Sequence, residues 1–118
     1  MAYVDGYVLA VPKAKLDDYW KMATLGRTVW MEHGALSYCE ALADDVPYGE
    51  VTSFPRAVQA TDDETVIFSF ITYRDRAHRD EVNAKVFADP RMNDFDPKSA
   101  PFDMKRMIFG GFEGKIEA

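Results

Sequence analysis

Two histidines are the most chemically versatile side chains in this sequence. His78 falls in the first turn of a predicted helix, where the helix dipole disfavours the protonated ring, so we expect a neutral imidazole. A neutral ring can act as a base, a ligand or a hydrogen-bond partner, and the spacing to Val82 and Val86 turns it toward the predicted sheet. His33 ends another predicted helix, where the dipole favours the protonated ring. We weigh a structural against a catalytic role at both positions, with Asp5 as a third catalytic candidate.

Arginine and asparagine side chains supply candidates for ligand binding. Arg79 and Asn83 lie one turn apart on a helix, and an amide beside a guanidinium suits planar recognition of a carboxylate. The alternative is a solvated face with local ion pairs. Arg106 and Arg56 are further candidates, although most such charges form salt bridges. Asp5 interrupts an apolar strand, so we expect its carboxylate to be paired or capped.

Several kinds of site are not indicated. Cys39 lies among alanines without a catalytic-cysteine context, so it is expected to behave as a small hydrophobe. Two histidines, one cysteine and no HExxH motif indicate no metal site. The glycines form no phosphate-binding loop. We therefore expect neither a metal nor a cofactor.

The charge balance narrows the possible partners. The 118 residues include 14 Lys and Arg against 20 Asp and Glu, a formal net charge of −6. Nucleic acid and anionic membrane surfaces are disfavoured as partners because both require local basic excess. The longest apolar run covers residues 7–11, far short of the roughly 20 that span a bilayer. No secretory signal is visible, so the cytoplasm is the expected compartment.

The elements that must position these residues follow from hydrophobic periodicity. Strands are predicted over residues 2–11, 35–43 and 65–73 and from about 104 to 113, where Gly110 and Gly111 suggest a bulge or a close backbone approach. Helices are predicted over about 13–33 and 76–88, the second capped by Asp75. Residues 51–60 are interpreted as an extended arm with Pro55 at an edge position. Residues 90–101 are interpreted as a loop with one short helical turn around Met92.

This order predicts one α+β domain over residues 1–118 with the ferredoxin-like βαββαβ arrangement. A four-stranded antiparallel sheet would carry both helices on one face. The first, third and last strands are apolar in both phases, so the other face also needs a cover. A second copy of the same sheet is the simplest cover, which predicts a symmetric homodimer.

Blocks of residues along nearly the whole chain resemble the YbaA-like family of small bacterial proteins. The blocks are YVDGYV at 3–8, WMEHGAL at 30–36, TSFPRAV at 52–58, RAHRD at 76–80, VNAKV at 82–86, DPRM at 89–92 and PFDMKRMI at 101–108. The resemblance implies the dimeric α/β-barrel superfamily, and hence both the fold and the dimer. That superfamily includes cofactor-free monooxygenases, isomerases, haem enzymes and ligand-sensing domains, so the resemblance implies no particular activity.

Three functions remain open at this point. The aromatic side chains could line a pocket between helices and sheet, so the first expectation is a protein that binds a small molecule there. The second is a cofactor-free enzyme, monooxygenase-like or isomerase-like, with His78 or His33 carrying a proton. The third is a structural or interaction dimer without a ligand.

Overall fold

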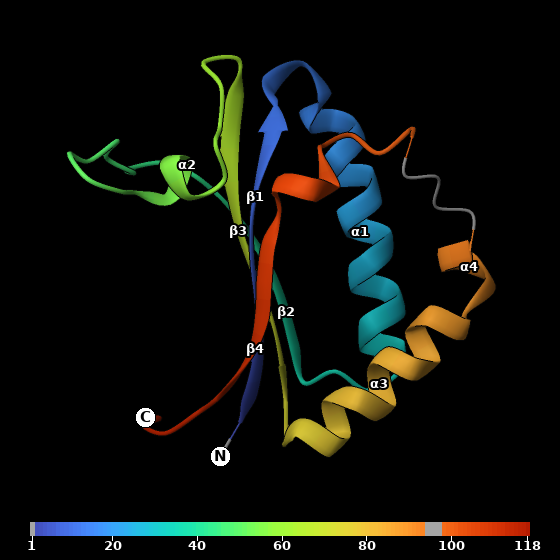
Figure 1. The fold of residues 1–118 in the computed structure, drawn as a ribbon. Coiled ribbons are helices and arrows are strands. Elements are labelled where there is room, and N and C mark those ends of the chain that lie inside the picture. Colours follow the sequence, from blue (N-terminus) through green and yellow to red (C-terminus); the bar gives the residue numbers. More distant parts are fainter. Residues whose placement is uncertain (1, 94–97) are drawn as a thin grey trace.

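An antiparallel sheet with two helices packed on one face forms the body of the molecule (Figure 1). The computed structural model describes residues 2–93 and 98–118. The strands are β1 (Tyr3–Pro12), β2 (Ser37–Leu42), β3 (Glu64–Tyr73) and β4 (Ile108–Glu113). Their order is β2-β3-β1-β4, and every neighbouring pair is antiparallel. The predicted α+β class and four-stranded antiparallel sheet are confirmed.

The two long helices begin and end near the predicted residues. A 3₁₀ turn, η1 (Lys13–Lys15), leads into α1 (Leu16–Glu32), and Gly34 follows with a positive φ of 111°, which favours glycine at the end of a helix. Helix α3 (Arg76–Ala88) starts after Asp75, whose side chain accepts a hydrogen bond from the His78 amide at 2.7 Å. The predicted N-cap is therefore confirmed.

Short helices appear where the prediction was wrong or incomplete. Residues 51–60 are not an extended arm, because α2 (Phe54–Ala57) forms there. The Ser53 side chain accepts from the Arg56 amide at 3.2 Å, and Pro55 occupies the first turn, where its missing N–H costs no hydrogen bond. The turn predicted around Met92 is α4 (Pro90–Asn93); the rest of that predicted loop, at 94–97, lies outside the described residues.

The last strand begins later than predicted. Residues 104–106 form a 3₁₀ turn, η2 (Met104–Arg106), because the Asp103 side chain accepts from the Lys105 amide at 2.9 Å and turns the chain. From Ile108 the register with β1 runs without interruption past Gly110 and Gly111, so there is no bulge. The alternative prediction, a close approach, is confirmed: a Cβ on Gly111 would overlap the Tyr3 ring and hydroxyl.

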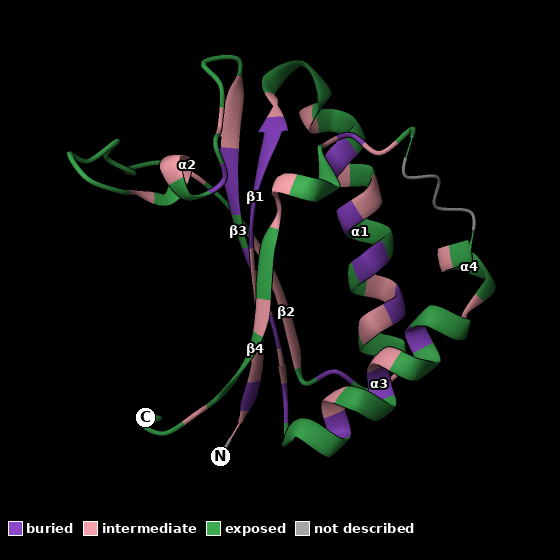
Figure 2. Cartoon of the chain, in the orientation of Figure 1, coloured by how far each residue is buried: buried purple, intermediate pink, exposed green. Residues whose placement is uncertain are grey.

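Side chains of the central strands alternate between two layers. On the helix side, Leu9 and Val11 of β1 pack with Tyr19 and Ala23 of α1. On the other side, Val8 and Ala10 pack with Val66 and with Val58, which follows α2. Helix α2 covers only one end of that second face (Figure 1), and β4 is largely exposed (Figure 2). The sheet therefore has one face buried by helices and one mostly open.

Replacing Gly111 tests the close approach to Tyr3. We expect Gly111→Ala to lower the free energy of unfolding by about 1–3 kcal/mol, because Tyr3 is a buried ring with little room to move. The matched control is Gly110→Ala, whose Cβ would lie 3.7 Å from the Phe112 ring, an ordinary contact. Urea denaturation of both variants measures the difference. Equal stabilities of the two variants would contradict this packing.

Candidate functional site

A cavity of about 600 Å³ lies between the sheet and the helices α1 and α3. Apolar and aromatic side chains from α1, α3 and all four strands form most of its wall. The aromatic lining includes Tyr7, Tyr19, Trp30, Tyr38, Phe102 and Phe109. Its volume lies within the range of small-molecule sites in proteins. The pocket predicted between helices and sheet is therefore present as a space.

One row of side chains crosses the floor of this cavity. The strand registers place Glu40 opposite Ser69, Ser69 opposite Tyr7, and Tyr7 opposite Phe109. All four line the cavity, so one polar row runs from β2 to an aromatic end on β4. The Tyr7 and Phe109 rings stack with centroids 6.3 Å apart.

The Glu40 carboxylate is held by two tyrosine hydroxyls. Tyr19 donates to Oε1 at 2.5 Å and Tyr38 donates to Oε2 at 2.6 Å. Burial and the neighbouring carboxylate raise the pKa of both hydroxyls well above the usual range, so both remain protonated donors. Within residues 2–93 and 98–118, Glu40 forms no ion pair. It presents a fixed negative charge at one end of the row.

Sequence analysis did not select Glu40, although a signal was available. In the strand over residues 35–43, Glu40 shares its phase with Tyr38 and Leu42, so the apolar phase carries a charge. The same argument drew attention to Asp5 in the first strand. A charged residue in the core-facing phase needs either partners or a solvated space.

A second polar cluster, centred on Asp5, lies in the neighbouring row. Asp5 is 4% exposed, and Arg79 Nη1 donates to its Oδ1 at 2.6 Å, so the predicted pairing of Asp5 is confirmed. Burial raises the pKa of Asp5, and Arg79 opposes that shift. Arg79 Nε also donates to Asp80 at 2.7 Å, so two carboxylates share one guanidinium. The guanidinium lies over the Tyr3 ring, 4.9 Å from its centroid.

Asn83 joins this cluster to the helix layer. Its Oδ1 accepts hydrogen bonds from Trp30 Nε1 at 3.1 Å and from the Tyr73 hydroxyl at 3.3 Å. Of the predicted site residues, the structure thus brings Asp5, Arg79 and Asn83 together at the cavity.

The two histidines lie away from the described cavity lining. His78 is buried, and its Nδ1 accepts a hydrogen bond from the Arg74 amide at 3.0 Å. A ring nitrogen that accepts carries no proton, and the guanidinium of Arg74, 3.4 Å from Nε2, can only donate, so the backbone amide is the partner that holds the ring. His33 Nε2 lies 2.8 Å from Asp89, whose pKa is held well below its usual range by Arg91 and His33. Both histidines have structural partners.

Arg56 and Arg106 also do not line the cavity. Arg56, on α2, donates to the backbone carbonyls of Tyr48 and Gly49 at 2.9 and 3.1 Å. Arg106 donates to both oxygens of Glu64 at 2.8 and 2.7 Å. Arg56 thus ties α2 to the loop before it, and Arg106, which also donates to the Gln59 carbonyl at 2.8 Å, ties η2 to the segment that leads into β3.

The described part of the chain offers no metal-binding cluster and no helix that could span a membrane. Residues 2–93 and 98–118 contain no cluster of three His, Cys, Asp or Glu side chains arranged to hold a metal ion. None of their helices combines the length and apolarity needed to cross a membrane. Cys39 is a half-buried free thiol.

Comparison with known proteins assigns this chain to a protein family. Residues 2–104 match the family described as "Protein of unknown function (DUF1428)", so the chain belongs to that family. It is 50% identical over 117 residues to "Uncharacterized protein YbaA" of Escherichia coli strain K12, covering 99% of each chain, and equally to that of Shigella flexneri. The resemblance to the YbaA-like family is confirmed.

A solved structure is similar only distantly. The chain aligns with "De novo designed protein Foldit4" at a TM-score of 0.47 and 9% identity, over 98% of this chain and 100% of that chain. This similarity carries no functional argument. The names of the relatives assign no ligand or activity either, so a function must be argued from the cavity.

Removing the His78 ring tests its structural role. We expect His78→Ala to lower the free energy of unfolding by about 1–3 kcal/mol, because the Arg74 amide loses its acceptor and a buried ring is lost. His33→Ala should cost less, because His33 is partly exposed. Urea denaturation provides the comparison. A His78→Ala protein as stable as the wild type would exclude the structural role.

Acid titration tests the Glu64–Arg106 pair. Hydrogen bonds from Arg106 lower the pKa of Glu64 to about 2, from the 4.5 of a free glutamate side chain. Its stabilising contribution is therefore present above pH 4.5 and is lost as the pH falls through 2. We expect Glu64→Gln to be less stable than the wild type by about 1–3 kcal/mol at pH 7, with the difference shrinking as the pH falls toward 2.

The control for this titration is Glu81→Gln, which breaks an exposed ion pair with Lys85. Such pairs contribute little, so its stability should follow that of the wild type at every pH. Urea denaturation at several pH values measures all three proteins. A Glu64→Gln difference that does not change between pH 7 and 2 would rule out the linkage.

Proposed function

We propose that this protein is a homodimer that binds a small organic molecule in the cavity of each subunit. The observation that carries the proposal is the cavity of about 600 Å³, which no described side chain fills. The cavity is partly open to solvent, so a ligand can enter it, and its volume lies in the range of small-molecule sites. A space of this size in a chain of 118 residues favours an occupant.

The residues that line the cavity have the composition of a small-molecule binding site. Most of the wall is apolar, and a few polar groups converge on the floor, which is the usual composition of a small-molecule site. Glu40 is fixed by Tyr19 and Tyr38, so the cavity holds one polar group in a defined orientation without a ligand. Neither histidine lines this space, so binding is better supported than acid–base catalysis by His33 or His78.

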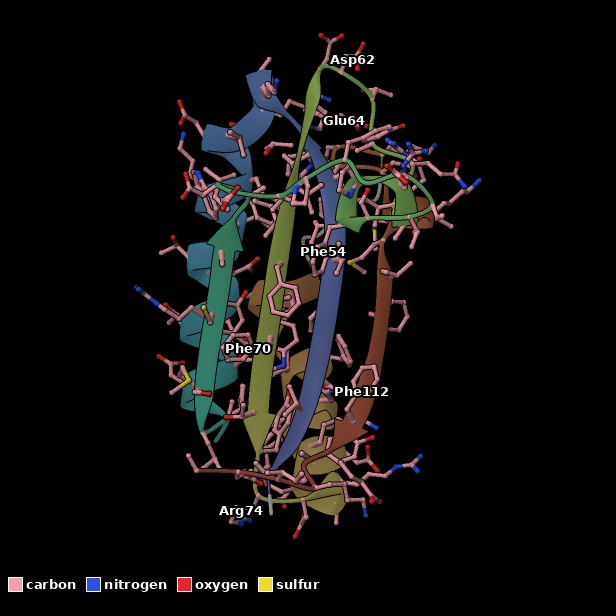
Figure 3. All side chains as sticks on the ribbon, turned by 90° about the vertical axis from the view of Figure 1, so that its left-hand side faces the viewer. Phe54, Asp62, Glu64, Phe70, Arg74 and Phe112 are labelled. Carbon is pink, nitrogen blue, oxygen red and sulfur yellow. The ribbon has the colours of Figure 1, made fainter. Side chains whose placement is uncertain are left out.

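The assembly proposal rests on the face without α1 and α3. We infer that the strand order corresponds to the ferredoxin-like arrangement and that two sheets pack through these faces as a dimeric α/β barrel. Figure 3 views this face, with Phe54, Phe70 and Phe112 on it. Phe68 is 43% exposed, Ile108 46% and Phe112 63%. A second copy would remove this apolar surface from water.

A charge placed on the open face should separate the subunits. Size-exclusion chromatography with light scattering should give twice the 13.4 kDa of one chain for the wild type and 13.4 kDa for Phe112→Lys. The control is Phe87→Lys on the helix side, where Phe87 is 64% exposed and its replacement should leave the dimer intact. A wild-type monomer at micromolar concentration would refute the dimer.

A neutral fluorescent probe tests whether the cavity binds ligands. We expect N-phenyl-1-naphthylamine to bind the wild type with increased fluorescence. Met22→Trp, which fills the cavity from α1, should weaken this binding at least about tenfold, equivalent to roughly 1.4 kcal/mol. Leu25→Trp is the matched control, because Leu25 lies on the same helix but is 40% exposed and outside the lining. Equal binding by the two variants would place the probe elsewhere and refute the cavity as the site.

A further inference from the structure

We propose that the ligand is an organic cation, a protonated amine on an aromatic or apolar body, and that Glu40 binds the ammonium group. This inference rests on the proposed binding function of the cavity and adds the chemical class of the ligand.

The charges on the cavity wall favour a cation over an anion. The charged side chains among the described lining are Asp5, Glu40 and Arg79. The Arg79 guanidinium is already shared between Asp5 and Asp80, at 2.6 and 2.7 Å. Within the described residues no basic side chain forms an ion pair with Glu40, and Arg27, whose positive charge lowers the pKa of Tyr38, lies outside the lining. The charged groups of the lining itself, two carboxylates and one guanidinium, therefore leave the wall negative. A carboxylate or phosphate ligand would meet repulsion there.

Glu40 is arranged to accept further hydrogen bonds. Each of its oxygens accepts one tyrosine hydroxyl, from Tyr19 or from Tyr38, and a carboxylate oxygen has a second acceptor position. An ammonium group supplies three N–H donors, and such charge-assisted bonds are stronger than neutral ones. Because the tyrosines already fix the carboxylate, little side-chain freedom is lost when the ligand binds.

The two tyrosines that hold Glu40 each lie beside a further aromatic ring of the cavity wall. The Tyr19 ring lies edge-on to Phe102 with centroids 5.8 Å apart, and the Tyr38 ring lies 6.2 Å from Trp30. All four rings line the cavity. Ring faces attract cations, so a ring of this group whose face meets the ammonium would add to the attraction of Glu40.

The rest of the ligand would lie along the row of side chains that runs from Glu40 to Phe109. Glu40 on β2 and Phe109 on β4 are three strand spacings apart, about 14 Å. Between them, the Tyr7 hydroxyl forms no hydrogen bond with residues 2–93 or 98–118, and burial with the neighbouring charges raises the pKa of Tyr7 to about 12. As far as the described residues go, Tyr7 thus offers a protonated hydroxyl to a ligand, next to the stacked Phe109 ring.

Three probes of similar shape test the class of ligand. They are 2-phenylethylamine, 2-phenylethanol and phenylacetate, which are cationic, neutral and anionic at pH 7. Binding is measured by calorimetry and by the fluorescence of the tryptophans, one of which, Trp30, lines the cavity. For the wild type we expect the amine to bind about tenfold more tightly than the alcohol, and phenylacetate to bind most weakly.

Glu40→Gln removes the charge and keeps an acceptor for one tyrosine hydroxyl, while the other hydroxyl can accept from the amide NH2. We expect this variant to lose about tenfold in amine affinity and to bind the alcohol as the wild type does, so the preference disappears. Glu81→Gln makes the same change of charge at an exposed position on α3 and should keep the preference. Circular dichroism confirms folding, and the wild-type ratio tests the ligand class even where the variant does not fold.

The outcomes separate this inference from the proposed function. Equal wild-type affinity for amine and alcohol, or tighter binding of phenylacetate, overturns the inference. A preference for the amine that survives in Glu40→Gln overturns the role of Glu40. If no phenyl probe binds while N-phenyl-1-naphthylamine does, the inference fails and the cavity remains a binding site. If the naphthylamine fails as well, both proposals fail.

Discussion

The pairing of β1 with β3 in the centre of the sheet is the constraint on which the cavity depends. This pairing places Tyr7 opposite Ser69 and Asp5 opposite Ile71, all on the helix side. A shift of β1 by one residue along β3 would move Tyr7 and Asp5 to the other face and bring Val8 under the helices. The floor of the cavity, its polar row and the apolar open face are therefore consequences of one register.

The helices lie over this floor without closing onto it along their whole length. At one end, Val29 of α1 and Val82 and Val86 of α3 pack tightly with Tyr73. At the other end, Tyr19 and Ala23 pack on Leu9. The cavity lies between the first of these contacts and the second, whose residues form part of its wall.

Polar groups inside this layer are stabilised in two different ways. Asp5 is nearly fully buried and is compensated by Arg79, a guanidinium that also reaches Asp80. Glu40 is less buried and is stabilised by the hydroxyls of Tyr19 and Tyr38 without a described cationic partner. The first arrangement is complete within the chain. The second leaves a charge facing a cavity, and this difference underlies the proposed preference for a cation.

The sequence alone determined the structural features that depend on residues close together in the chain, such as helix positions and caps. The period of apolar residues placed α1 and α3, and the Asp75 cap marked the start of α3. That the second sheet face needs a cover, as the strands apolar in both phases indicate, stays a prediction. Local signals can also compete. At residues 51–60 the Ser53 cap and a proline in the first turn favoured a helix over the expected arm.

Contacts between distant residues were decided only by the tertiary structure. The sequence showed that Asp5 needs a partner, but the choice of Arg79, 74 residues away, depends on α3 packing across the sheet. Tyr19 and Glu40 are 21 residues apart and meet because α1 lies over β2. Periodicity tells which face of an element is buried, since it depends on local geometry. It does not tell which side chains meet across two packed layers, because that depends on how the layers are placed relative to each other.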